Sequence, residues 1–276
     1  MKIRFGPAGV PLSAKTRSTL DGIKRCSELG LGAMEVEFVH GVKMESEIAL
    51  QANKIAKELD IELSIHAPYY INLCSLDKKI VARSIYHIFS SMKIGHLLKA
   101  KPIVIHTGFY QNKPKEVCDK LVLENYADLI QKAKKENIEF LLGPELTGKP
   151  TAYGNLEEIV NLSLKLGIDN VLPVIDFAHY YARANPLKSE EDYKKVLDYC
   201  EKNLGEKFAK NLHIHFSGIE FTEKGERKHL PVKSNTPPFK PLLKVLKEGG
   251  YAGKIICESP LLEQDALILQ KEFEKI

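Results

Sequence analysis

Short runs of β-branched and other apolar residues recur along the chain, and segments with apolar residues at helical spacing separate them. One such helical segment carries Val81, Ile85, Ile88 and Met92 on a single face. The apolar runs predict eight strands, at residues 2–5, 34–39, 62–66, 103–106, 139–142, 172–176, 212–216 and 254–258. Each strand is therefore expected to be followed by a helix.

Strands that alternate with helices pair in parallel, and eight such units without a break in composition predict one closed barrel. Two helix starts carry a capping side chain three residues before a carboxylate, Asn155 with Glu158 and Ser189 with Asp192. An open, doubly wound sheet is the alternative, but the turn at residues 6–9 does not lead into a GxGxxG fingerprint. We therefore expect a (β/α)8 TIM barrel that forms a single domain over residues 1–276.

Composition narrows the class of protein. The 276 residues are 44% hydrophobic and 28% charged, which is typical of a globular protein with a large core. No apolar run reaches the ~20 residues that cross a bilayer, and no signal segment is visible, so we expect a cytoplasmic protein without a membrane partner. Five scattered cysteines fit reduced thiols, and the net charge of +4 is compatible with a polyanionic substrate without requiring one.

Polar side chains stand at the ends of six predicted strands, where a barrel of this class carries its chemistry. One histidine at such a position is more often a hydrogen-bonded core residue than a ligand, but six strand ends together favour a metal site. Imidazole and carboxylate groups are the ligands that zinc and manganese prefer. The strand-end residues are His66, His106, Glu145, Asp176 with nearby His179, His213 with His215, and Glu258.

Other histidines and carboxylates are given structural roles. His87 and His96 lie within a lysine-flanked helix and are assigned no chemistry. His40 follows the second strand and is expected to line the pocket rather than bind metal. Glu35 and Glu37 share one face of that strand and are interpreted as interior structural charges.

The segments that carry these residues resemble the endonuclease IV family, within the wider group of xylose-isomerase-like barrels. The similar segments are His66-Ala67-Pro68-Tyr69-Tyr70-Ile71-Asn72-Leu73, His106-Thr107-Gly108, Glu145 with Gly148 and Lys149, residues 176–182, and Glu258-Ser259-Pro260. Lys228-His229-Leu230 is similar to the loop after the family's seventh strand. The resemblance covers most of the chain.

The resemblance implies two to three zinc ions, with manganese as a possible substitute, and ligands shared between neighbouring ions. The implied ligands are His66, His106 and bridging Glu145 for the first ion, Glu145, Asp176, His215 and Glu258 for the second, and His179 and His229 for the third. His213 shares a face with His215 and is the alternative ligand.

Two departures from the family pattern bear on this cluster. The family has an aspartate two residues before its loop histidine, where this chain has Arg227, with Glu226 and Glu220 as nearby carboxylates. The third metal position therefore lacks one of the ligands that the family pattern implies. The seventh strand also continues into Phe216-Ser217-Gly218 where the family usually has Asn-Asp, which leans toward sugar-epimerase relatives.

The resemblance implies that a metal-activated hydroxide near catalytic Glu145 cleaves DNA 5′ to abasic sites. Tyr69 and Tyr70 would act as wedges in damaged double-stranded DNA, although packing within their loop is an alternative for both, and Lys43 would meet a phosphate. A monomer is expected.

Two rival classes remain. A single-metal sugar isomerase or epimerase would need only Glu145, Asp176, His215 and Glu258. A non-catalytic DNA-binding relative would have lost several ligands, whereas only the aspartate is missing here.

Overall fold

Eight parallel strands form a closed barrel in the computed structural model, which describes residues 2–183 and 186–276. The barrel strands are β1 (Ile3–Pro7), β2 (Ala33–Glu37), β3 (Glu62–His66), β4 (Ile103–Ile105), β6 (Leu142–Pro144), β8 (Ile175–Asp176), β9 (Leu212–Phe216) and β12 (Gly253–Cys257). They pair in two parallel sheets, in the orders β1-β12-β9-β8 and β2-β3-β4-β6. Parallel bridges from Ala8 to Glu35 and from Glu145 to Val174 join the two sheets, so the predicted barrel is confirmed.

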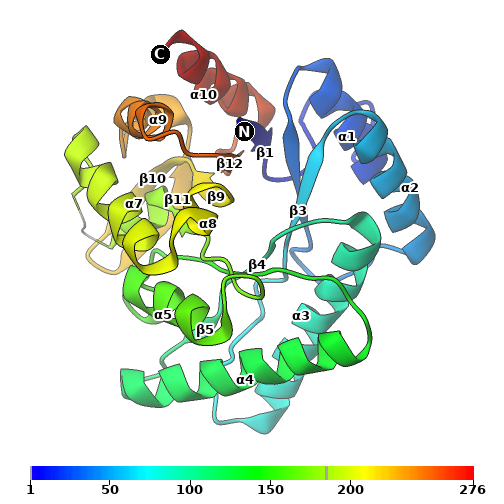
Figure 1. Ribbon diagram of the computed structural model, residues 1–276, viewed down its shortest axis with the longest axis vertical. Coiled ribbons are helices and arrows are strands. Elements are labelled where there is room, and N and C mark those ends of the chain that lie inside the picture. Colours follow the sequence, from blue (N-terminus) through cyan, green and yellow to red (C-terminus); the bar gives the residue numbers. More distant parts are fainter. Residues whose placement is uncertain (1, 184–185) are drawn as a thin grey trace.

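Helices surround the strands, and the sequence colours run once around this ring from blue to red (Figure 1). The helices are α1 (Thr19–Glu28), α2 (Ser46–Glu58), α3 (Lys78–Leu98), α4 (Lys115–Lys135), α5 (Leu156–Leu166), α6 (Phe177–Ala182), α7 (Glu190–Leu204), α8 (Glu206–Ala209), α9 (Phe239–Glu248), α10 (Glu263–Lys275) and the short 3-10 helix Val232–Ser234. The last helix returns to the first strand, where the rings of Phe5 and Phe273 lie 5.5 Å apart. Within the described ranges, no helix is long and apolar enough to cross a membrane.

Both predicted capping boxes are confirmed. At the start of α5 the Asn155 side chain accepts from the Glu158 backbone N–H at 2.8 Å, and the Glu158 carboxylate accepts from the Asn155 N–H at 2.9 Å. At α7 the Asp192 carboxylate accepts from the Ser189 N–H at 3.0 Å. These contacts satisfy backbone donors that the first helical turn leaves unpaired.

The fifth strand was predicted at the wrong place. It was expected at residues 139–142 and lies instead at Leu142–Pro144. Glu139 is tied to the end of α3, because its N–H donates to His96 Nδ1 and its carboxylate pairs with Lys99. The strand includes Gly143, where a β-carbon would come within 2.8 Å of Val174, so a small residue permits the close approach of the neighbouring chain.

Two strands, Glu62–His66 and Leu212–Phe216, lie where they were predicted, and the boundaries of the remaining strands differ from the prediction by up to three residues. The largest of these shifts is in the sixth strand, expected at residues 172–176 and reduced to Ile175–Asp176. Pro173 lacks a backbone N–H for the ladder, and only isolated bridges at Val171 and Val174 precede the strand.

Two short hairpin-like sheets stand outside the barrel and were not predicted. β10 (Gly218–Thr222) and β11 (Gly225–Leu230) form an antiparallel pair after β9, and β5 (Gly108–Phe109) pairs with β7 (Ala152–Tyr153). All four follow the carboxyl ends of barrel strands. They therefore build the walls of the end of the barrel at which the polar residues were predicted.

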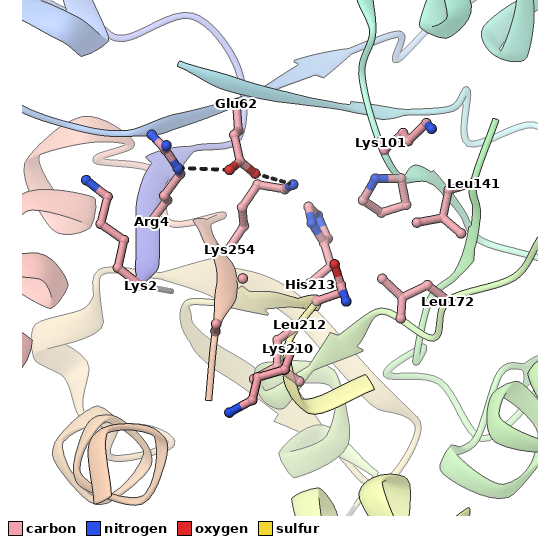
Figure 2. Close-up of a pocket in the computed structure, with 14 residues that line it drawn as sticks. Lys2, Arg4, Glu62, Lys101, Leu141, Leu172, Lys210, Leu212, His213 and Lys254 are labelled. Atoms are coloured by element: carbon pink, nitrogen blue, oxygen red, sulfur yellow. Dashed lines mark hydrogen bonds and ion pairs between the residues drawn. The ribbon is translucent and has the colours of Figure 1, made fainter. Parts of the chain in front are cut away.

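A cavity of about 400 Å³ lies at the opposite, amino end of the strands. Glu62 stands between two cations there, with its carboxylate 2.9 Å from Arg4 Nε and 2.9 Å from Lys254 Nζ (Figure 2). The residues that line this cavity include the cationic side chains of Lys2, Arg4, Lys101, Lys210 and Lys254. At this end of such barrels, side chains serve stability more than chemistry.

Replacing Asn155 by alanine should lower the free energy of unfolding by about 1 kcal/mol, because α5 loses its capping side chain. Urea denaturation of the purified protein measures this loss. Asn161→Ala is the matched control, since Asn161 lies exposed within the same helix and alanine favours helix there. Equal losses in the two variants would contradict the capping role.

Candidate metal centre

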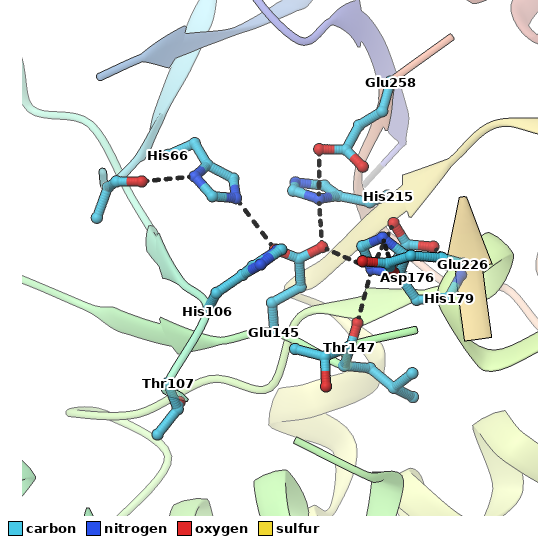
Figure 3. Close-up of polar contacts among 12 residues, drawn as sticks. His66, His106, Thr107, Glu145, Thr147, Asp176, His179, His215, Glu226 and Glu258 are labelled. Atoms are coloured by element: carbon cyan, nitrogen blue, oxygen red, sulfur yellow. Dashed lines mark hydrogen bonds and ion pairs between the residues drawn. The ribbon is translucent and has the colours of Figure 1, made fainter. Parts of the chain in front are cut away.

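The carboxylate of Glu145, which is fully buried just after β6, lies at the centre of the polar residues. Its Oε2 lies 3.1 Å from His66 Nε2 and 2.8 Å from His106 Nε2. Its Oε1 faces the other way and lies 3.2 Å from His215 Nδ1 (Figure 3). The two oxygen atoms of one side chain therefore serve two separate groups of residues.

All eight predicted ligands come together in three overlapping groups, each with its donor atoms within 4.8 Å of one another. The groups are His66, His106 and Glu145; Glu145, Asp176, His215 and Glu258; and Asp176, His179, His229 and Glu258. The first two groups share Glu145, and the last two share Asp176 and Glu258. Such sharing is the arrangement that adjacent metal ions require, while the role of each residue as a ligand stays a prediction.

Three of the histidines are oriented by backbone carbonyl groups. The Nδ1 atoms of His66, His179 and His229 lie 2.8, 3.0 and 3.0 Å from the carbonyl oxygens of Ala67, Leu146 and Glu258. A carbonyl can only accept, so these contacts place the proton of each neutral imidazole on Nδ1. A neutral ring held in this way leaves its Nε2 free to bind a cation in the centre.

His215 is oriented in the opposite sense. Its Nδ1 faces Glu145 and Glu258, and its Nε2 lies 2.9 Å from Oε1 of Glu35. His213 lies deeper in the barrel, with its Nε2 3.0 Å from Oε2 of Glu35. His213 therefore faces Glu35 rather than the carboxylates of the centre, which favours His215 over His213 as the ligand.

Burial and neighbouring charges shift the pKa values of the carboxyl groups in opposite directions. Burial raises the pKa of Asp176 well above its usual range, and it raises the pKa of Glu37 to about 8. For Glu145, burial is outweighed by His106 and His215, which hold its pKa well below the usual range. Packing several carboxylates together is costly unless a positive charge neutralises them.

The donor set fits a divalent cation. Several buried carboxylate oxygens lack a hydrogen-bond partner among the described residues, including one each from Asp176, Glu226 and Glu258. Buried oxygen atoms ordinarily have a hydrogen-bond partner. Carboxylate oxygens that lie close together without one are the environment in which a positive ion is expected. Imidazole nitrogen and carboxylate oxygen together suit zinc or manganese.

Glu226 enters the centre because β11 contains a β-bulge. The pairing with β10 runs from Glu220 opposite Lys228 to Phe221 opposite Glu226, which leaves Arg227 as an extra residue. Arg227 and Lys228 both turn outward to Glu220, at 2.8 and 3.1 Å. Glu226 therefore faces inward, and its Oε2 lies 3.1 Å from His179 Nε2.

This bulge changes the spacing of the third group. In a regular strand residues two apart share a face, whereas one extra residue makes residues three apart share it. Glu226 and His229 are three apart, and both side chains face His179, whose Nε2 lies 3.3 Å from His229 Nε2. A carboxylate from the position before Arg227 thus lies beside His179, although the aspartate of the family pattern is missing at residue 227.

The centre opens into a cavity of about 320 Å³. Tyr69 borders it with 44% of its surface exposed, and its ring centroid lies 4.8 Å from that of His66. Phe109 and Lys149 also line the cavity and were not proposed from the sequence. Phe109 follows the His106-Thr107-Gly108 segment directly, so its position beside a strand end was the available signal.

Two of the proposed DNA-contacting residues lie outside the lining of that cavity. Tyr70 is 59% exposed, and its hydroxyl lies 3.2 Å from His40 Nδ1. Lys43 is exposed in the segment between β2 and α2. His40 therefore contacts the tyrosine loop.

The remaining histidines have structural surroundings. His96 Nδ1 accepts from the Glu139 N–H at the end of α3, and His87 lies partly buried on the same helix. Neither histidine belongs to the groups described above.

The relatives found by sequence include an uncharacterized protein and proteins named as probable endonucleases. An uncharacterized protein of Methanocaldococcus jannaschii is 38% identical over 273 residues, covering 99% of this chain and 97% of the relative. A probable endonuclease 4 of a Sulfurihydrogenibium species is 27% identical over 170 residues, which are 60% of this chain and 59% of that relative. The chain thus aligns with somewhat over half of that named relative.

Solved structures of two activities share the fold. Endonuclease IV from Thermus thermophilus superposes with a TM-score of 0.75 at 17% identity, covering 98% of this chain and all of the other. A D-tagatose 3-epimerase-like protein gives 0.72 at 17% identity, covering 98% and 96%. At this identity the likeness shows the fold alone. A family model matches residues 23–274, and the chain accordingly belongs to the xylose isomerase-like TIM barrel family.

Proposed function

We propose that this protein is a metal-dependent phosphodiesterase that cleaves DNA 5′ to abasic sites, in base excision repair. The observation that carries the proposal is the presence of His66 and His106 beside the Glu145 carboxylate, and of His229 beside Asp176, His179 and Glu258. One divalent ion needs only Glu145, Asp176, His215 and Glu258. The additional histidines extend the donor set to three adjacent positions, as a phosphodiesterase with several ions requires.

The orientation of these additional histidines supports the proposal further. His66, His179 and His229 each have the far ring nitrogen bonded to a backbone carbonyl, so their near nitrogen is held toward the centre. A histidine that served only to fill the core would not need this common orientation.

The residues of the chain would divide the work of hydrolysis. Zinc or manganese bound in the centre would supply the nucleophile and neutralise charge on the phosphate oxygens. Glu145 would hold the first two positions together, because its two oxygens face His66 and His215 separately. Glu226 would complete the third position beside His179.

The loops around the cavity would hold the DNA. Tyr69 and Tyr70 stand exposed after β3, and Phe109 is 44% exposed after β4. Exposed aromatic side chains beside a catalytic cavity suit wedges that keep an abasic nucleotide out of the base stack. Lys43 and Lys149 would contact phosphates, with the overall charge of +4 assisting the approach of DNA.

A sugar isomerase or epimerase is the second candidate. The tetrad Glu145, Asp176, His215 and Glu258 alone would hold the single ion that such an enzyme uses. The superposition with a D-tagatose 3-epimerase-like protein favours this class as far as the fold is concerned. A single-metal isomerase or epimerase would leave His106 and Glu226 without a function.

Incision of a labelled duplex with one abasic analogue tests the proposal. With zinc or manganese present, we expect a cut 5′ to the analogue, and no cut in an undamaged duplex or with EDTA. Glu145→Gln should reduce cutting to the EDTA background while the circular dichroism spectrum stays unchanged, because this carboxylate serves two groups of ligands. A folded, metal-loaded protein that cuts under neither metal would shift the assignment to the epimerase class.

Glu226→Gln should reduce the number of retained zinc ions by one per chain, because the carboxylate that lies beside His179 of the third group loses its charge. Elemental analysis after gel filtration counts the ions. Glu220→Gln is the matched control, since Glu220 belongs to the same hairpin but pairs with Arg227 and Lys228 on its outer face. Unchanged zinc content in Glu226→Gln would remove Glu226 from the centre.

Tyr70→Ala should raise the dissociation constant for abasic DNA about tenfold, or roughly 1.4 kcal/mol, through loss of an aromatic wedge. Fluorescence anisotropy in EDTA-free buffer measures the affinity. Tyr86→Ala provides the control, because Tyr86 is 68% exposed on the barrel-surrounding helix α3. Loss of metal from Tyr70→Ala would show that its loop supports the centre instead of the DNA.

A further inference from the structure

A buried carboxylate that the proposed chemistry does not use lies directly beneath the metal centre. Glu35 points into the barrel from β2 and is fully buried. A charge in the interior of a barrel is costly unless several donors surround it. Glu35 accepts hydrogen bonds from two donors, Ser64 Oγ at 2.7 Å and His213 Nε2 at 3.0 Å. His215 Nε2 lies 2.9 Å from its other oxygen, and among the described residues neither of these two buried atoms has a hydrogen-bond partner.

The two oxygens of Glu35 are divided between these partners. Oε2 lies beside Ser64, the residue in register with Glu35 on β3, and beside His213. Oε1 is left for His215. The support from Ser64 and His213 therefore holds the carboxylate in the orientation that faces His215.

His215 is the histidine of the centre for which this support matters most. Glu145 and Glu258 lie 3.2 Å from its Nδ1, and both could accept a proton from that nitrogen. A proton on Nδ1 would satisfy the two carboxylates and block the nitrogen as a ligand. Glu35 lies closer, at 2.9 Å from Nε2 on the opposite side of the ring. Both atoms of this contact are buried without a hydrogen-bond partner among the described residues, so a proton on Nε2 directed at Glu35 would satisfy both.

We propose that Glu35 is a positioning residue that keeps the proton of His215 on Nε2 and so presents Nδ1 to the ion shared with Glu145, Asp176 and Glu258. The backbone carbonyls that orient His66, His179 and His229 are neutral. The group beside Nε2 of His215 is instead the carboxylate of Glu35. A charged partner makes the ligand nitrogen more basic and strengthens metal binding. The inference rests on the metal-binding part of the proposed function and is independent of the substrate.

Zinc affinity of the metal-free protein, measured by competition with a chromophoric chelator, tests the proposal. Glu35→Gln removes the charge and keeps the shape, and it should weaken the tightest zinc site ~10- to 100-fold. Glu35→Leu also removes both acceptor oxygens and should weaken it at least as much. Wild-type affinity in both variants would overturn the proposal.

Glu37→Gln is the matched control, because Glu37 lies two residues along the same strand and is also a carboxylate in the interior. We expect a smaller loss of affinity in this variant than in Glu35→Gln. An equal loss would show that the effect does not depend on contact with His215, which contradicts a specific role for Glu35. Thermal unfolding of each metal-free variant checks that the barrel remains folded.

Nitrogen-15 NMR of histidine-labelled, zinc-loaded protein shows which ring nitrogen of each histidine carries the proton and which binds zinc. A purely structural role of Glu35 would not change this assignment. In the wild-type protein His215 should bind through Nδ1 with its proton on Nε2, the reverse of His66, His179 and His229. A proton on Nδ1 of His215, or zinc on its Nε2, would overturn the proposal. Because no DNA is involved, failed incision would count against the proposed function, while unchanged zinc binding in the Glu35 variants would count against this inference alone.

Discussion

Mutual repulsion among buried carboxylates is the constraint on which the polar end of this barrel depends. Glu35, Glu145, Asp176 and Glu258 lie within one cluster of short contacts, and nearly all of their surface is removed from water. The histidines between them supply part of the balancing charge. The remaining unpartnered oxygens mark where a bound cation would supply the rest of the positive charge.

The barrel makes this concentration possible because its strands are parallel and in register. Asp176 on β8 lies opposite His215 on β9, and Glu37 on β2 lies opposite His66 on β3. Side chains at the same height on adjacent strands point to the same side, so strand ends contribute ligands at one level. Glu145 joins this level through its bridge to Val174.

The sequence allowed prediction of the barrel and of the residues that converge, because both follow from strand ends that are visible as apolar runs. It did not reveal the partners of Glu35, since an interior contact between β2 and β9 depends on barrel closure rather than on local pattern. The role of Glu226 was also hidden, because a bulge at Arg227 reverses the alternation that a regular strand would show. The fifth strand was misplaced because Gly143 and Pro144 argue against a strand locally, whereas packing against Val174 favours it.

The bulge in β11 also explains why a carboxylate still lies beside the third group although the expected aspartate is missing. An arginine at an inward position beside His179 would place a cation against the centre and oppose a metal ion. Shifting Arg227 outward to Glu220 removes that conflict and, in the same step, turns Glu226 inward. A change of one residue in strand pairing therefore supplies a carboxylate for the proposed third metal position despite the arginine at residue 227.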